Sequence, residues 1–565
     1  MGSNLLPVLS PNAEARSDAK AFGAYYTQEA VARFLVRWAV RSSTDAVLDP
    51  SSGGGIFLAT AADRLTKLGR RRESQVFGVE LEPTTHAETS VRIEGRFGIS
   101  AKHMICRDFF AIDPAEMPRM NAVVGNPPFI RYQRFTGSDR EQAIKRAAVQ
   151  GVKLPRLASS WAAFVVHSTA FLAEGGRLAM VLPMELGHAS YARPILAFLA
   201  QNFYRLQLIT FQRSLFPQLS EDTVLLLAED RRRSDGRLAD ARLYDLEGPE
   251  ALDTFFPARN TGVDLTGFFR GNHRLTEFFL PENIRELYAR LQAVGVARPV
   301  GEFADIGIGY VSGRNDFFHP SSDVLKVHKL PPRYLRRAAL NGGALRGLEF
   351  TEADWSEAFA KRHSGNLLYL PAEGVLPDSV AGYLELGRAQ KVHEAYKCRV
   401  RKSWYAVPHV YVADGFLTYM NGAQTRLVAN AASAVAPNTL HLVRLHPKSK
   451  LGIYDLASRW LSSLTQMSAE IEGHAMGGGM LKLEPREAES VIVPCGQRAE
   501  PLRPETATEF DVRLRHGEFA KARELADELY LRAELGLSAK ECAALQVAAL
   551  TLRNRRTQRK RSALP

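Results

Sequence analysis

The stretch LDPSSGGGIFL, residues 48–58, joins a short apolar strand to an apolar helix through three consecutive glycines. Glycine adopts left-handed backbone conformations freely and lets a ligand approach the main chain closely. A glycine-rich turn between a strand and a helix is therefore typical of cofactor sites, although dinucleotide and phosphate sites share it. The lysine of a nucleoside triphosphatase loop is absent, which argues against that class of enzyme.

Strand-like and helix-like segments alternate around this turn. We expect helices at residues 28–40, 57–68 and 161–172. The expected strands are residues 46–49, 75–80, 103–106, 121–125, 177–182, 206–211 and 223–228. This alternation predicts an α/β fold with a doubly wound, mostly parallel sheet covered by helices on both faces. Ligands of such sheets bind at the carboxyl ends of the strands.

The tetrapeptide Asn126-Pro127-Pro128-Phe129 follows directly after the expected strand 121–125, at such an end. An exocyclic amine is a poor nucleophile because its lone pair is delocalised into the ring. The side-chain oxygen of Asn126 and the carbonyl of Pro127 can both accept hydrogen bonds from that amine, and the prolines fix the backbone. Phe129 offers an aromatic face to a base. A simple proline turn is the alternative; such a tetrapeptide arises by chance on the order of one time in a hundred in a chain of this length.

Acidic residues end or follow two further strands. Glu80 ends the strand 75–80, about 25 residues after the glycine turn, where a carboxylate can bind ribose hydroxyls. Asp108 follows the strand 103–106 and can accept a hydrogen bond from an adenine amino group, with Phe109 packing on its ring. An ordinary strand end explains each of them equally well alone, but all these features occur in order at strand ends.

Composition limits the classes of function. The chain has 565 residues and a net charge of +12, which favours a polyanionic partner, nucleic acid before an acidic membrane; a modestly basic enzyme is the alternative. Its four cysteines form no CxxC pair, so neither a zinc ribbon nor a disulfide framework is indicated, and reduced thiols in a cytosolic protein are expected. The histidines show no metal-ligand spacing. No signal peptide or bilayer-spanning run is evident.

Four segments are expected along the chain. They are a flexible N-terminal arm at residues 1–20, the α/β domain at 21–270, a mixed α+β domain at 275–500 and a helical extension with a basic tail at 505–565. The strand series is expected to end at residue 228. The charged, turn-like stretch that follows is interpreted as an excursion or a hinge.

Taken in this order, the residues resemble the adenine-N6 DNA methyltransferases of restriction–modification systems, in the gamma arrangement. Residues 23–27, Gly-Ala-Tyr-Tyr-Thr, are similar to the N-terminal cofactor motif of the family, and residues 49–58 to its first motif. Glu80, Asp108 and the tetrapeptide 126–129 follow in family order. Phe216-Pro217 is similar to a later motif, so the resemblance covers roughly residues 20–230.

The resemblance implies a class I methyltransferase sheet, S-adenosylmethionine as the cofactor and no metal. It implies cofactor contacts for seven residues: Thr27, Asp49, Gly53, Gly55, Glu80, Asp108 and Phe109. Asn126 and Pro127 would orient the target N6, and Phe129 and Phe216 would sandwich a flipped adenine. Methyl transfer would be a direct in-line displacement from sulfur, without a covalent enzyme intermediate.

The C-terminal half resembles a target recognition domain in two places. Residues 310–317, which include Tyr310, Arg314, Asn315, Asp316 and Phe317, are similar to a segment early in that domain. Residues 476–485, MGGGMLKLEP, are similar to the segment that closes it, and their glycines favour a turn over a DNA contact. The arginine-rich end at 553–561 is interpreted either as a phosphate grip or as a disordered basic tail.

Double-stranded DNA is the expected partner, in the cytoplasm of a prokaryote and at its nucleoid, with no membrane. Cleavage, if any, is expected in a separately encoded restriction endonuclease. An RNA or protein-glutamine amino methyltransferase using the same site is one alternative; the long C-terminal domain argues against it. A non-catalytic DNA-binding methyltransferase subunit is another, and the intact Asn126 and Pro127 argue against it.

Overall fold

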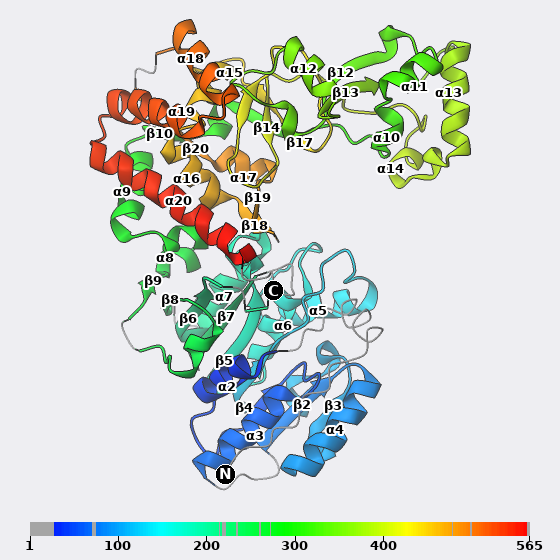
Figure 1. The fold of residues 1–565 in the computed structure, drawn as a ribbon. Helices are drawn as coiled ribbons and strands as arrows, with labels where there is room; N and C mark the ends of the chain where they lie inside the picture. Colours follow the sequence, from blue (N-terminus) through cyan, green and yellow to red (C-terminus); the bar gives the residue numbers. More distant parts are fainter. Residues whose placement is uncertain are drawn as a thin grey trace. The chain divides into compact units, whose positions relative to one another are not determined.

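The computed structural model describes residues 27–69, 75–213, 215–216, 222–232, 236–258, 261–271, 273–476, 478–497 and 500–561 (Figure 1). The chain folds into two compact units. Of the described residues, one unit holds those up to Phe279 and those from Gln558 on, and the other spans Leu280–Thr557. The arm expected at residues 1–20 and most of the motif at 23–27 lie outside the described residues. Among the described helices, none combines the length and the apolar character that a membrane crossing needs.

A nine-stranded sheet in the order β3-β2-β1-β4-β5-β7-β6-β8-β9 forms the centre of the first unit. Its strands are β1 (Val47–Asp49), β2 (Val76–Glu80), β3 (Met104–Cys106), β4 (Met120–Gly125), β5 (Leu172–Pro183), β6 (Phe203–Phe211), β7 (Thr223–Arg231), β8 (Asp240–Leu246) and β9 (Val263–Asp264). The strands β1 to β5 run parallel to one another, and β7 runs antiparallel to β5 and β6. The predicted α/β fold with a mostly parallel sheet is therefore confirmed.

The expectation that the strand series ends at residue 228 is wrong. Strand β8 pairs with β6 in parallel along its whole length, and β9 pairs with β8 in antiparallel fashion. Ala241, Leu243 and Tyr244 are buried, while Asp240 and Arg242 are partly exposed. Charged residues interrupt the apolar ones in β8, and the charged run before it gives the segment the composition of a hinge.

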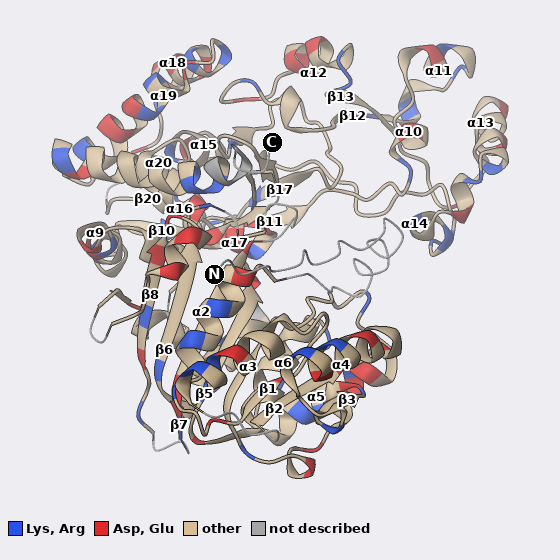
Figure 2. Ribbon diagram, turned by 60° about the horizontal axis from the view of Figure 1, so that its bottom comes forward, with Lys and Arg blue, Asp and Glu red and all other residues tan. Residues whose placement is uncertain are grey.

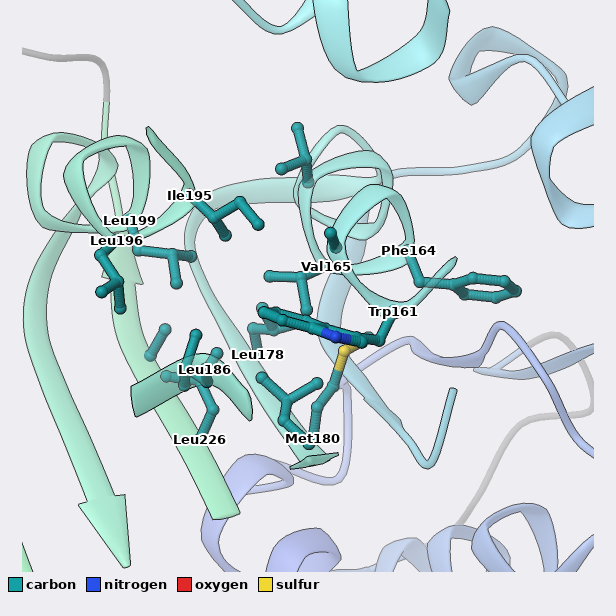
Figure 3. Packing of buried hydrophobic residues seen from close by; sticks show 14 of the residues in the cluster. Trp161, Phe164, Val165, Leu178, Met180, Leu186, Ile195, Leu196, Leu199 and Leu226 are labelled. Carbon is teal, nitrogen blue, oxygen red and sulfur yellow. The ribbon is translucent and has the colours of Figure 1, made fainter. Parts of the chain in front are cut away.

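Helices cover both faces of this sheet. They are α2 (Glu29–Ala39), α3 (Ile56–Leu68), α4 (Pro83–Phe97), α5 (Gly137–Val149), α6 (Ser160–Thr169), α7 (Arg193–Asn202) and α8 (Thr266–Phe269). Successive strand residues point to opposite faces, and Val123 and Val124 of β4 belong to two different apolar clusters. Trp161, at the start of α6, lies in the first cluster over Met180 of β5 (Figure 3). The helices α2 and α3 pack against the sheet in the second cluster.

The second unit is a mixed α+β structure with small sheets. Its strands are β10 (Ala297–Pro299), β11 (Ala304–Ile308), β12 (Leu335–Ala339), β13 (Ser364–Leu368), β14 (Gly415–Thr418), β15 (Met420–Asn421), β16 (Leu427–Ala429), β17 (Leu440–Leu445), β18 (His474–Met476), β19 (Met480–Lys482) and β20 (Ile492–Pro494). The largest sheet has four strands in the order β11-β17-β14-β16. The mixed architecture expected for this part of the chain is confirmed.

Helices surround these sheets and form the C-terminal region. They are α9 (Glu282–Ala293), α10 (Asn315–Phe318), α11 (Ser322–Val327), α12 (Glu352–Phe359), α13 (Asp378–Ala389), α14 (Tyr396–Arg399), α15 (Ile453–Arg459), α16 (Ser463–Glu472), α17 (Pro485–Ser490), α18 (Pro504–Arg515), α19 (Phe519–Ala526) and α20 (Ala539–Arg561). Phe510 and Tyr530 of the C-terminal helical region join Trp460 in one apolar cluster. The helical segment therefore packs as part of the second unit.

Candidate active site

The glycine turn between β1 and α3 packs against α4 at Gly55 and leaves space beside the main chain at Gly53. Gly53 and Gly55 have φ angles of +46° and +70°, in the left-handed region. A Cβ at Gly53 would meet no atom within 4 Å, whereas a Cβ at Gly55 would lie 2.8 Å from Cγ2 of Thr89. The Thr89 hydroxyl donates to the Gly53 carbonyl at 2.8 Å. Gly55 thus lets α4 pack against the turn, and Gly53 leaves space beside the main chain.

Glu80, the last residue of β2, is tied to the same turn. Its Oε2 accepts a hydrogen bond from the Gly53 amide at 2.8 Å, and its Oε1 accepts one from the Glu82 amide at 2.9 Å. A carboxylate oxygen has two acceptor positions, so both oxygens can also accept from a ligand's hydroxyl groups. The two backbone contacts fix the carboxylate at the rim of the turn.

Asp49, the last residue of β1, is 1% exposed. Its Oδ1 accepts from the Ser51 amide at 3.2 Å, and its Oδ2 has no hydrogen-bond partner within the described ranges of the chain. Burial raises the pKa of the Asp49 carboxyl to about 8, and the nearby charge of Glu80 also raises it. A buried carboxyl oxygen in this state suits a cationic or hydrogen-bond-donating ligand.

The raised pKa of Asp49 predicts a pH-dependent stability. The carboxyl stays protonated in the folded protein up to about pH 8, whereas in the unfolded chain it ionises near pH 4. Unfolding therefore releases a proton in this window, and the free energy of unfolding falls as the pH rises. Relative to Asp49→Asn, whose amide stays neutral, the wild-type protein should lose on the order of 1 kcal/mol per pH unit between pH 5 and 8. Urea unfolding of both proteins across this range checks it; parallel stability curves would contradict the raised pKa.

The loop that follows β4 meets the glycine turn and the start of α2. The Asn126 side chain donates from Nδ2 to the Thr27 hydroxyl at 3.2 Å. The Asn126 carbonyl accepts from the Ser51 hydroxyl at 3.2 Å. Gly125 before it also faces β1, because a Cβ there would lie 3.0 Å from Oδ1 of Asp49. These contacts join the neighbouring carboxyl ends of β1 and β4 into one site.

Ser160, at the start of α6, fixes the other side of this loop. Its hydroxyl donates to the Pro128 carbonyl and accepts from the Ile130 amide at 2.9 Å. The Ser160 amide donates to the Ile130 carbonyl at 3.0 Å. Phe129, between the two bonded residues, is partly buried and packs against the apolar clusters of both sheet faces. Sequence reasoning missed Ser160, because a serine at a helix start ordinarily indicates only a cap.

The remaining expected site residues differ in burial: Asp108 is partly exposed, whereas Phe109 and Phe216 are buried. Asp108 is partly exposed and caps a short 3₁₀ helix by accepting from the Phe110 amide at 3.0 Å. Burial raises the pKa of its carboxyl. Phe109 is 2% exposed and stacks on Phe164 with ring centroids 5.3 Å apart. Phe216 is 1% exposed in the cluster beneath α2 and α3. Both rings therefore face the core.

The structure thus gathers most of the expected site at neighbouring strand ends. The expected residues joined there by direct contacts or by immediate chain neighbours are Thr27, Asp49, Gly53, Gly55, Glu80, Asn126, Pro127 and Phe129. The rings of Phe109 and Phe216 are buried in the two apolar clusters against which Phe129 packs. The Gln28 side chain, beside Thr27, donates to the Leu215 carbonyl at 2.7 Å, so the backbone before Phe216 does approach it.

In the second unit, the segment at 310–317 divides between core and surface. The Tyr310 hydroxyl is buried and bonds to Nε2 of His319 at 2.8 Å. Phe317 stacks on Tyr383 with ring centroids 4.6 Å apart. Arg314, Asn315 and Asp316 are exposed. The two aromatic side chains stabilise the unit, and only the three polar ones present their side chains to solvent.

The expected turn at 476–485 is confirmed. Strands β18 and β19 form a hairpin, and Gly478 and Gly479 between them have φ angles of +79° and +72°. The Gly479 carbonyl accepts a hydrogen bond from Nη1 of Arg556 in α20. The arginine-rich end at 553–561 has two interpretations, a phosphate contact or a disordered tail, and both are wrong for Arg556. Its side chain is 5% exposed and forms an ion pair with buried Glu470 at 2.7 Å.

Comparisons with known proteins agree with this arrangement. The family model N-6 DNA Methylase matches residues 8–238, and the model for the C-terminal domain of Type II methyltransferase M.Eco57I matches residues 272–531. Type II methyltransferase M.XamI of Xanthomonas campestris pv. amaranthicola is 21% identical over 489 residues, which cover 84% of this chain and 85% of that protein. Type II methyltransferase M.HincII of Haemophilus influenzae is 23% identical over 206 residues, 36% of each chain.

A solved structure shares the fold. The Type IIL restriction-modification enzyme MmeI, solved in complex with DNA, has a TM-score of 0.54 and 14% identity; the match covers 96% of this chain and 76% of that one. The two family models match successive parts of the chain, first the unit with the large sheet and then the mixed unit. Both matched models are domains of DNA methyltransferases, so the resemblance of the sequence to the methyltransferases of restriction–modification systems is confirmed.

Proposed function

We propose that this protein transfers a methyl group from S-adenosylmethionine to the N6 atom of an adenine, flipped out of duplex DNA, at a specific sequence. The contact between Asn126 and Thr27 carries the proposal, because it joins the loop after β4 to the cofactor side of the sheet. The bond also sets the orientation of the carboxamide: the amide nitrogen points at Thr27, and the oxygen serves as the acceptor for the target amine.

The residues present fit the cofactor. The open side of Gly53 gives room beside the main chain, Asp49 offers a buried oxygen to the cationic methionine end, and Glu80 offers a fixed carboxylate to ribose hydroxyls. Asp108 would accept from the adenine amino group. When bound, the cofactor supplies an electrophilic methyl group on a sulfonium. That no metal takes part stays a prediction.

At the target, Asn126 and Pro127 would act on the exocyclic amine. The Asn126 oxygen and the Pro127 carbonyl accept its two hydrogens, which favours a pyramidal nitrogen whose lone pair points at the methyl group. The nitrogen would displace the cofactor's sulfur in line, leaving a neutral thioether, and the methylated amine would pass its extra proton to water. Ser160 holds Phe129 at the position where a base would stack. Phe216 remains a predicted stacking residue for the flipped base, and Phe109 a predicted contact of the cofactor's adenine; both rings are buried in the structure.

Long-read sequencing of DNA from cells that express the protein tests the proposal. N6-methyladenine confined to one short motif is the expected result, with none in cells expressing Asn126→Ala. The absence of modified adenine, with a folded protein that binds the cofactor, would contradict it. Labelled cofactor offered with duplex DNA, RNA and protein would then identify an RNA or a glutamine substrate, or show a non-catalytic subunit.

Three further expectations stay predictions. The gamma arrangement is one, and a separately encoded restriction endonuclease as partner is the second. Action in a prokaryotic cytoplasm at the nucleoid, away from any membrane, is the third. The relatives M.XamI and M.HincII are named methyltransferases, and MmeI is named a restriction-modification enzyme in complex with DNA, which favours DNA as the partner.

A further inference from the structure

Two loops flank helix α5 and attach to the catalytic loop from both sides. The first, residues 130–136, continues the chain from Phe129, and the second, residues 150–158, leads to Ser160. Ser160 bonds to the backbone on both sides of Phe129, as described above. Arg140 of α5 joins the two loops, since its Nη1 donates to the Arg156 carbonyl at 3.0 Å and lies 3.5 Å from the Tyr132 carbonyl. We call residues 130–136 and 150–158 together the paired-loop surface.

The paired-loop surface carries exposed cations. They are Arg131, Arg134, Lys153 and Arg156. Within the part of the chain that the structure describes, Arg134, Lys153 and Arg156 form no ion pair. The nearest acidic residues in sequence are Asp139 and Glu141, both exposed on α5, so positive charge predominates on the loops themselves (Figure 2).

Large apolar side chains stand among these cations. Leu157 is 61% exposed and Tyr132 is 37% exposed. Leu154 and Ala158 on either side of Leu157 are buried, and the Ala158 amide donates to the Pro155 carbonyl at 3.0 Å. The loop is therefore anchored while Leu157 points outward, only three residues before the serine that holds the catalytic loop. A fixed leucine exposed to water beside cations is suited to a polyanionic partner with an apolar interior.

We propose that the paired-loop surface holds the target strand of duplex DNA on either side of the flipped nucleotide, and that Leu157 enters the space which the flipped base leaves. The inference rests on the proposed function. Lysine and arginine contacts to phosphates position a protein on DNA without reading sequence. Apolar wedges that enter the duplex replace part of the stacking that flipping removes. Leu157 gains burial only in the flipped state, so it shifts the equilibrium towards that state.

Leu157→Ala tests the wedge. With 2-aminopurine at the target position, the fluorescence increase on binding should fall, and the single-turnover transfer rate should drop about tenfold on an ordinary duplex. The rate should recover when the target adenine faces an abasic site, because that base is already unpaired. Cofactor affinity should not change. Val149→Ala, which alters a 70% exposed residue at the end of α5, is the matched control.

The possible results separate the inference from the proposed function. Wild-type protein that methylates no duplex DNA overturns the proposed function and the inference with it. Active wild-type protein with an unchanged Leu157→Ala variant, or a variant equally impaired on the abasic-site duplex, overturns the wedge alone. Arg134→Gln, Lys153→Gln and Arg156→Gln should each reduce the slope of log affinity against log salt by about 1. Lys102→Gln, an exposed change beside the amino end of β3, is the control; unchanged slopes in all three loop variants overturn the phosphate contacts.

Discussion

Asn126→Ala is expected to reduce methyl transfer by at least about a thousandfold while the protein still binds cofactor and DNA. The variant loses the side-chain oxygen that accepts a hydrogen from the target amine, and it loses the bond to Thr27 that orients the loop. Neither loss removes the glycine turn or the carboxylates of Asp49 and Glu80. The effect should therefore appear in the chemical step and not in cofactor affinity.

Single-turnover transfer of a labelled methyl group to a duplex with one target site measures this, together with calorimetric binding of the cofactor. Thr27→Val is a graded comparison. It keeps the Asn126 acceptor but removes the hydroxyl that Nδ2 contacts, so its rate should lie between those of the wild-type protein and Asn126→Ala. If Asn126→Ala kept more than a tenth of the wild-type rate, the acceptor mechanism would be wrong.

Arg556→Met is expected to lower the free energy of unfolding of the second unit by about 3–5 kcal/mol. Arg556 bonds through Nε and Nη2 to the two carboxylate oxygens of Glu470 at 3.0 and 2.7 Å, and through Nη1 to the Gly422 carbonyl at 3.0 Å. Both side chains are about 5% exposed. Removing the arginine leaves a buried carboxylate with its principal cation gone, which is strongly destabilising.

Chemical unfolding of three variants isolates this ion pair. Arg532→Met removes an exposed arginine that pairs with Glu528 at 2.6 Å, and should cost less than about 1 kcal/mol. Combining Arg556→Met with Glu470→Leu should restore part of the lost stability, because the buried carboxylate is removed as well. Recovery should be incomplete, since Arg553, whose side chain is 12% exposed, loses its own ion pair with Glu470 at 3.7 Å. A loss in Arg556→Met no larger than in Arg532→Met would contradict the buried pair.

The parts of the fold that follow from the sequence are those in which local pattern and burial agree. Strand β1, the glycine turn and α3 lie within a residue of their expected bounds, since a buried parallel strand is apolar throughout and the turn requires glycine. Strand β8 was missed because it follows a charged, turn-like stretch and itself carries three charged residues, Asp240, Arg242 and Asp245. The site was predictable to the extent that its residues end neighbouring parallel strands, where topology alone brings Asp49 and Asn126 together.

Other features depend on partners that are remote in sequence. Ser160 bonds to a loop that lies about thirty residues before it in the sequence. Arg556 bonds to Glu470, which precedes it by 86 residues, and no local periodicity predicts either pairing. The orientation of Phe109 and Phe216 could not be predicted from the sequence either. An aromatic residue next to a motif can face the ligand or the core, and residue type alone does not decide between them.

The late position of Arg556 has a consequence for biosynthesis. Glu470 leaves the ribosome 86 residues before Arg556, the cation with which it pairs. At ordinary rates of translation this interval lasts about 4 to 17 seconds. The nine-stranded sheet, by contrast, is complete at Asp264, long before either residue is made. The nascent protein should therefore acquire its first folded unit during synthesis, while the second stays dependent on the final helix and exposed to proteolysis until the last segment emerges.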